Sequence, residues 1–167
     1  MASSSLAWTY VWMFFDKSRE WTMFLSFAAA IYYHNALVAH LNIGAVLCAV
    51  LAKGLKLIIR QDRPVDAKTK KTSFGMPSTH SASAMYFGTY LTYLLIGDKI
   101  NQPFTAVPLA NALAASAALL IFLNGYHSIA QVLAGSFLGV AFATTWLNNR
   151  VYVAPYIEML LVVLNLQ

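Results

Sequence analysis

The sequence contains little charge. Only 10% of its 167 residues are charged and 59% are hydrophobic, whereas about a quarter of the residues are charged in a typical soluble domain. This composition excludes an ordinary water-soluble globular domain. A transmembrane helix needs about 20 mostly apolar residues. The length therefore provides for five or six spans in a single membrane domain covering residues 1–167.

Cysteine is also nearly absent, and the N-terminal start carries no charge. The single Cys48 lies in an apolar stretch, so one chain can form neither a disulfide nor a cysteine metal cluster. Residues 1–5 contain no charged side chain, unlike the basic start of a secretory signal. We therefore expect the first span to act as its own membrane signal.

The basic residues are unevenly distributed. The net charge is +5, and seven of the eleven Lys and Arg residues lie between Lys53 and Lys71. The positive charge is therefore a local feature of the chain. We expect no nucleic-acid partner, and we expect membrane lipids around the chain.

The long apolar runs are continuous rather than alternating, which predicts helices, because lipid cannot satisfy exposed backbone groups. The predicted fold is an all-α, polytopic membrane helix bundle with five to six transmembrane helices. Residues 1–20 form a predicted interfacial segment with a charged break at 16–20, and residues 60–77 form a predicted active-site loop. The expected spans are 21–40, 42–59, 79–96, 106–125 and 129–147, with a short sixth at 151–166 broken by Pro155 and Glu158.

Counting the crossings brings the polar residues to one membrane face. The second span ends at the 60–77 loop, the third begins there, and the fourth ends on the same side. Five side chains should therefore share that face, namely Lys56, Arg63, Ser78, His80 and His127. Ionisable side chains at membrane depth are costly unless they are functional or paired.

A basic triplet stands at the entrance of the loop. Lys56, Arg60 and Arg63 have the spacing i, i+4 and i+7, which on a continuous helix predicts one shared face that can hold a polyanion. Pro64 should end that helix. The alternative interpretation is that the three residues anchor a helix end at the interface by snorkelling.

Residues 75–80 (GMPSTH) combine a glycine-containing turn with a helix start. Backbone N–H groups at such a start favour anions, and Ser78 can cap the helix or donate to a phosphate oxygen. His80 falls in the first turn, where we expect it to face the same anion. The alternative is a packed or capping histidine with no catalytic role.

His127 is followed four residues later by Gln131. On a helix start the Gln131 amide oxygen could orient the imidazole, fix its tautomer and leave the other nitrogen free to attack. Two histidines and a basic cluster, without the carboxylates preferred by Mg²⁺, favour metal-free phosphoryl transfer with no cofactor. A zinc ion bound by the two histidines stays open as an alternative.

These motifs resemble the type 2 phosphatidic acid phosphatase superfamily. Residues 56–64 (KLIIRQDRP) match its first motif, K-x6-R-P, and residues 77–80 (PSTH) match its second, P-S-x-H. The third motif, S-R-x5-H-x3-D, is kept only at His127. The resemblance implies that Lys56, Arg63, Ser78 and the Thr79 N–H bind phosphate, that His127 attacks phosphorus, and that His80 protonates the leaving oxygen.

The third motif departs from the family at two positions. Ile121 stands where the family has Arg, and Gln131 where it has Asp. We expect Arg60 to be able to replace the missing cation, and the neutral Gln131 to slow turnover. Residues 126–133 (YHSIAQVL) and 74–78 (FGMPS) are similar to the dolichyl-diphosphatase branch. That resemblance implies a polyprenyl diphosphate substrate and an integral protein of the endoplasmic reticulum.

Two alternative functions stay open at this point. The losses at Ile121 and Gln131 would also fit a relative that binds a lipid phosphate without hydrolysing it. The same pocket could instead carry out other prenyl diphosphate chemistry. The orientation is likewise open, because the positive-inside rule places the basic loop in the cytosol, whereas the resemblance implies a lumenal site.

Overall fold

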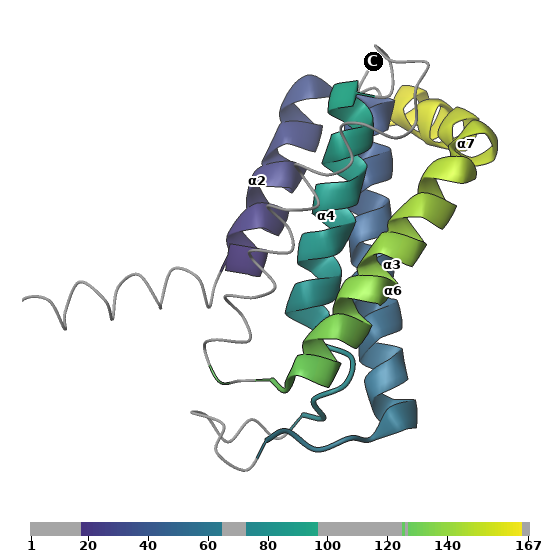
Figure 1. Cartoon of the computed structure of the whole chain (residues 1–167). Helices are drawn as coiled ribbons and strands as arrows, with labels where there is room; N and C mark the ends of the chain where they lie inside the picture. The colour runs from purple at the N-terminus through teal and green to yellow at the C-terminus, as the bar shows by residue number, and fades with distance from the viewer. Residues whose placement is uncertain (1–17, 65–72, 97–124, 126, 165–167) are drawn as a thin grey trace, which may run out of the picture.

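The computed structural model describes residues 18–64, 73–96, 125 and 127–164. Every regular element within these residues is a helix (Figure 1), as the all-α prediction requires. α3 and α6 are long and apolar enough to cross a membrane, while the total of five to six spans stays a prediction. The predictions for residues 1–17, 65–72 and 106–124, including Ile121, lie outside the described residues. The helices are α2 (Ser18–Tyr33), α3 (Ala36–Ile59), α4 (Thr79–Ile96), α6 (Ile129–Asn148) and α7 (Arg150–Val163).

The predicted boundary between the first two spans is wrong. The chain turns at His34, whose φ is 46°, and Asn35 caps α3 by accepting a hydrogen bond from the Leu37 N–H at 2.7 Å. The expected break near residues 40–42 lies inside α3. Asn42 is tolerated there because its amide nitrogen donates to Ser26 O at 3.0 Å and to Val38 O at 2.8 Å.

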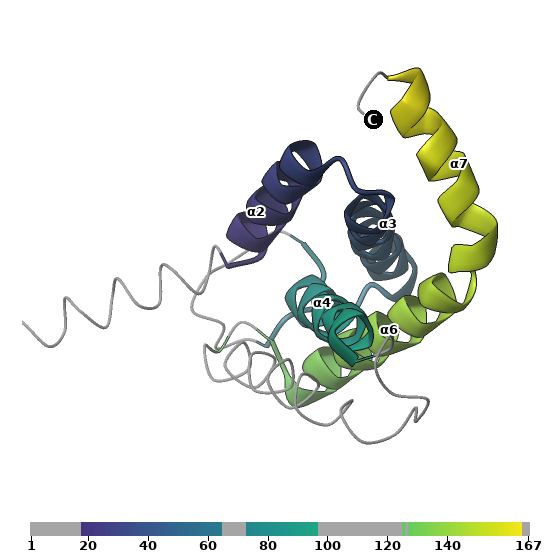
Figure 2. The same ribbon diagram turned by 90° about the horizontal axis from the view of Figure 1, so that it is seen from above.

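Two further boundaries differ from the prediction. Residues 18–20, expected in a charged break, already belong to the first turn of α2. Pro155 lies inside α7 and does not interrupt it. Figure 2 shows α7 leaving the end of α6 and passing outside α3. With 14 residues, α7 is shorter than a usual membrane span.

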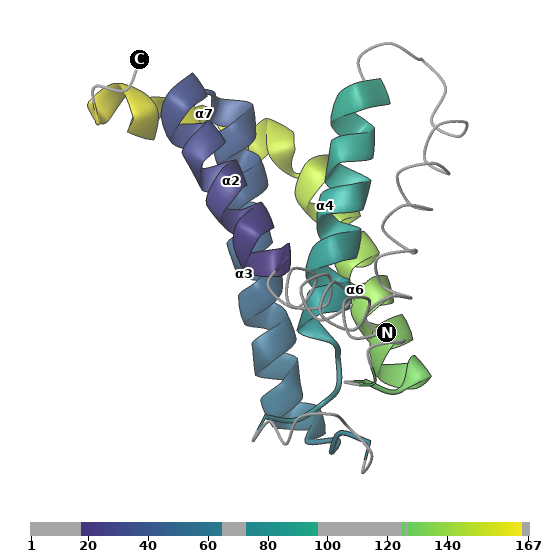
Figure 3. The same cartoon turned by 90° about the vertical axis from the view of Figure 1, so that its left-hand side faces the viewer.

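α4 and α6 pack closely because glycines remove side chains from their contact (Figure 3). A Cβ atom at Gly135 would collide with the backbone of Ser78, and one at Gly139 would collide with the backbone of Ala82. Small residues in α6 thus permit close approach of the two helix backbones. This contact fixes the start of α4 against the first half of α6.

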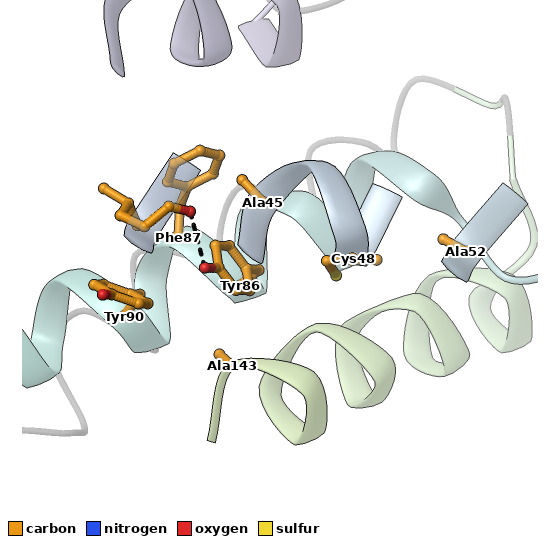
Figure 4. Packing of buried hydrophobic residues seen from close by; sticks show 9 residues of the cluster. Ala45, Cys48, Ala52, Tyr86, Phe87, Tyr90 and Ala143 are labelled. Carbon is orange, nitrogen blue, oxygen red and sulfur yellow. Dashed lines mark hydrogen bonds between the residues drawn. The ribbon is translucent and has the colours of Figure 1, made fainter. Parts of the chain in front are cut away.

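The core lies where one face of α3 meets α4 and α6. Small α3 residues make room for the large Tyr86 of α4: Ala45 and Cys48 are buried beside it (Figure 4), and a Cβ atom at Gly44 would collide with its hydroxyl. The Tyr86 hydroxyl donates to Leu41 O at 2.9 Å, so its polar end is satisfied within the bundle. These contacts hold the C-terminal end of α3 beside the N-terminal ends of α4 and α6.

Candidate functional site

Three segments distant in sequence meet at one end of the bundle: the end of α3, the entry to α4 and the entry to α6 (Figure 1). The Gly75 N–H donates to Gln61 O at 2.7 Å, and the Ser78 N–H donates to Gln131 O at 2.9 Å. The convergence predicted by counting crossings is therefore present. Lys56, Arg63, Ser78, His80 and His127 all lie at this end.

Two of the three predicted phosphate-binding cations, Lys56 and Arg63, donate hydrogen bonds to residues 73–74. Lys56 is buried in the last turn of α3, and its Nζ donates to Phe74 O at 3.1 Å. Arg63 Nε donates to Ser73 O at 3.0 Å, and Nη2 donates to Ser73 Oγ at 3.1 Å. Burial lowers the pKa of Arg63 from its ordinary value, yet a guanidinium remains charged in proteins. Two positive charges are thus held beside the histidines.

Arg60 does not join this cluster, and the predicted helical spacing is wrong. α3 ends at Ile59, and Arg60 is its left-handed C-cap with φ 51°. The exposed Arg60 side chain turns back, and its Nε donates to Leu57 O at 2.9 Å. Arg63 therefore reaches the site from an extended segment rather than from the next turn of a helix.

His127 is buried, with 4% of its surface exposed, and both ring nitrogens have defined neighbours. Nδ1 lies 3.1 Å from Gln131 Oε1. Because an amide oxygen can only accept, Nδ1 carries the proton. Nε2 lies 3.5 Å from Arg63 Nη1. Burial, followed by the charge of Arg63, lowers the pKa of His127 to about 4, although the Gln131 hydrogen bond acts to raise it. At neutral pH the ring is uncharged and Nε2 holds a lone pair.

The orientation of the Gln131 amide is fixed by four hydrogen bonds. Its Nε2 donates to Asp62 O at 2.8 Å and to Gln61 Oε1 at 3.2 Å. Its Oε1 accepts from the Ser128 N–H at 3.3 Å as well as from His127. A carboxylate at this position could not donate to the two oxygens of residues 61–62. A glutamine therefore suits this loop better than the family's aspartate.

Sequence reasoning missed Gln61 and Ser128 as parts of the site, and it placed Gly75 in the turn without its packing role. A Cβ atom at Gly75 would collide with the Gln131 amide, so this glycine makes room for the glutamine. Ser128 and Gln131 form a capping box at the start of α6. The S-x-x-Q pattern of a capping box is visible in the sequence, whereas the Gln61 contact depends on tertiary structure alone.

The second motif forms the N-terminus of α4, as predicted. Ser78 is fully buried, and its Oγ accepts from the Ser81 N–H at 3.3 Å and from Ser81 Oγ at 3.0 Å. These contacts leave the Ser78 hydroxyl hydrogen to donate. Thr79 is the first helical residue, where backbone N–H groups have no acceptor within the helix. His80 is half-buried and close enough to His127 to act on it electrostatically.

The described residues thus form a helical bundle with a histidine-centred polar site at one end, bordered by two cations and a helix N-terminus. The profile of the PAP2 superfamily matches residues 35–154, which include every element of this site. The chain belongs to the PAP2 superfamily, a family of membrane phosphatases.

Comparison with individual proteins gives the same family. The chain is 32% identical over 110 residues to "Dolichyldiphosphatase 1" of Dictyostelium discoideum, covering 62% of this chain and 48% of that protein. It is 24% identical over 135 residues to "Lipid phosphate phosphatase epsilon 2, chloroplastic" of Arabidopsis thaliana, covering 78% and 46%. The chain therefore spans about half the length of the curated relatives it matches.

A solved structure has the same fold. The crystal structure of a transmembrane PAP2 type phosphatidylglycerolphosphate phosphatase from Bacillus subtilis superimposes with a TM-score of 0.59 at 23% identity. The match covers 76% of this chain and 66% of that one. At this level of identity the likeness concerns the fold.

Proposed function

We propose that the protein hydrolyses a lipid phosphate or diphosphate without a metal, using His127 as the nucleophile. The observation that carries the proposal is the 3.5 Å separation of Arg63 Nη1 and His127 Nε2. A phosphoryl group bound by the guanidinium would lie directly beside the unprotonated ring nitrogen. Electrostatic positioning of this kind supplies most of the catalysis in phosphoryl transfer.

The proposed reaction has two steps. Lys56, Arg63, the Ser78 hydroxyl and the Thr79 N–H hold the phosphate oxygens. His127 Nε2 forms a bond to phosphorus, the bond from phosphorus to the leaving oxygen breaks, and His80 gives that oxygen a proton. Throughout, Nδ1 keeps its proton and donates a hydrogen bond to Gln131 Oε1. Water then attacks phosphorus while His80 takes up a proton from it, the bond from phosphorus to Nε2 breaks, and inorganic phosphate leaves.

We further propose a polyprenyl diphosphate of the dolichyl type as the substrate and the endoplasmic reticulum as the location. Residues 74–78 and 126–133 support this choice by their similarity to the dolichyl-diphosphatase branch, and so does the dolichyldiphosphatase relative. The chloroplastic relative is described as a lipid phosphate phosphatase. Phosphatidic acid is therefore the natural comparison substrate.

The test is phosphate release from the protein purified in detergent, with a polyprenyl diphosphate and with phosphatidic acid, in the presence of a chelator. We expect release that His127→Ala abolishes and Lys56→Ala reduces strongly. Lys53→Ala is the matched control, because Lys53 lies one turn earlier on α3 with an exposed side chain. The faster substrate identifies the lipid class.

The main competing function is binding of a lipid phosphate without turnover. The observation that favours it is the neutral Gln131, which cannot stabilise a charged phospho-imidazole as a carboxylate would. Binding of the polyprenyl diphosphate without phosphate release, by protein with an unchanged unfolding temperature, would establish this function and overturn hydrolysis. Release of a product other than phosphate would instead establish other diphosphate chemistry.

A further inference from the structure

The start of α3 and the passage from α6 to α7 lie at the opposite end of the bundle from the start of α6 (Figures 1 and 3). A polar cavity is lined there by residues of the α3 start and of α7. Its volume is about 350 Å³. Its polar lining consists of His34, Asn35, His40, Arg150 and Glu158. None of these residues belongs to the three family motifs, and the proposed hydrolysis uses none of them.

His40 is the buried member of this lining and is held rigidly. Its ring stacks on Trp146 with centroids 4.7 Å apart, and Trp146 Nε1 donates to His40 O at 2.9 Å. Nδ1 lies 2.7 Å from the Tyr90 hydroxyl. Nε2 is buried and has no hydrogen-bond partner among the described residues. A buried polar group without a partner is costly, so a ligand that accepts from or donates to Nε2 would satisfy it.

The charges around His40 favour an anion. Ala36 and Leu37, the first residues of the 24-residue helix α3, line the cavity, and helix N-termini attract negative groups. Arg150 is half-buried and close enough to His40 to interact with it electrostatically. Glu158, the acidic group in the lining, has an exposed side chain, where water screens its charge.

We propose that this cavity binds a phosphate group. The Arg150 guanidinium and the α3 N-terminus would hold its oxygens. His40 would donate from Nε2–H, with Nδ1 accepting from the Tyr90 hydroxyl. A phospholipid headgroup and free phosphate share this chemistry. The position at an end of the bundle favours the headgroup, because headgroups lie at that depth in a membrane.

Trp146 provides a local reporter for the test. The sequence has four tryptophans, so replacing Trp8, Trp12 and Trp21 with Phe leaves only the ring that stacks on His40. We would titrate this protein with inorganic phosphate and, separately, with phosphatidylglycerol. Both titrations use a maltoside detergent, which contains no phosphate. We expect a saturable change in Trp146 emission in at least one titration, and the ligand that causes it identifies the source.

Three variants assign the signal to this cavity. Arg150→Gln should weaken binding by about tenfold or more, since it removes a charge-assisted bond. Glu158→Gln should strengthen binding, because it removes the one negative group. Arg63→Gln should leave the affinity unchanged, because Arg63 is at the other end of the bundle. No saturable change in either titration, or equal affinity in the parent and Arg150→Gln, would overturn the proposal. A change lost in Arg63→Gln would assign the signal to the His127 site and also overturn it.

Discussion

Replacing Gln131 with methionine tests the structure of the site most directly. Methionine has a similar length and no strong hydrogen-bonding group, so the volume beside Gly75 stays filled. The substitution removes the acceptor of the His127 Nδ1 proton at 3.1 Å. An unpaired buried donor costs about 1–3 kcal/mol. If the ring rotates so that Nδ1–H finds another acceptor, the population of the reactive orientation falls by the factor that corresponds to this free energy. We expect kcat to fall by about 5- to 150-fold.

The assay is steady-state phosphate release together with a thermal unfolding curve. KM should change less than kcat, because Arg63 keeps its hydrogen bonds to Ser73 and the Gln61 carbonyl keeps its bond to the Gly75 N–H. Gln61→Met is the matched control. It removes only the 3.2 Å bond to the Gln131 amide, so its kcat should fall by no more than a few-fold. Folded Gln131→Met protein with wild-type kcat would refute the positioning of His127 by this amide.

Three other perturbations have defined outcomes. The pKa of His127 is lowered to about 4. In a plot of kcat/KM against pH, the rate should therefore fall as the pH decreases through about 4. A fall near pH 6.5 would contradict the burial of His127. Arg60→Ala should change kcat/KM for phosphate release by no more than about twofold, whereas Arg63→Ala should lower it by about 10²–10³. Equal losses in the two variants would place Arg60 in the site. Gly135→Ala should lower the unfolding temperature, because its Cβ would meet the Ser78 backbone; an unchanged calorimetric transition would show that α4 and α6 can separate without cost.

The sequence predicted the helices well where hydropathy alone defines them, and less well where polar residues interrupt an apolar run. His40 and Asn42 were expected at a helix boundary, but both are buried within α3. Their polar atoms contact Tyr90 on α4 and Ser26 on α2. Such partners are set by tertiary packing, so a single sequence cannot indicate them. The true boundary at Asn35 uses an ordinary N-cap, a signal that is local and readable.

The candidate site was predictable in its motifs but not in its connections. Counting crossings was enough to bring Lys56, Arg63 and the two histidines to one end, because helix ends alternate between membrane faces. The backbone carbonyls that receive the Lys56 and Arg63 hydrogen bonds were not predictable. The position of Arg60 was not predictable either, because the periodic spacing assumed that the helix continues to Arg63, whereas α3 ends at Ile59.

The glycine contact between α4 and α6 has a consequence for how the site can move. The α4 N-terminus is joined to the start of α6, which follows His127, by the close contact at Gly135 and by the hydrogen bond from the Ser78 N–H to the Gln131 carbonyl. They form one half of the site, and contacts between main-chain atoms fix the distance between them. Lys56 and Arg63 belong to a second half, which meets the first through side-chain hydrogen bonds and the Gly75 N–H bond. Any change in the width of the site would therefore occur along the seam between these halves, while His127 and the α4 N-terminus would keep their relative geometry.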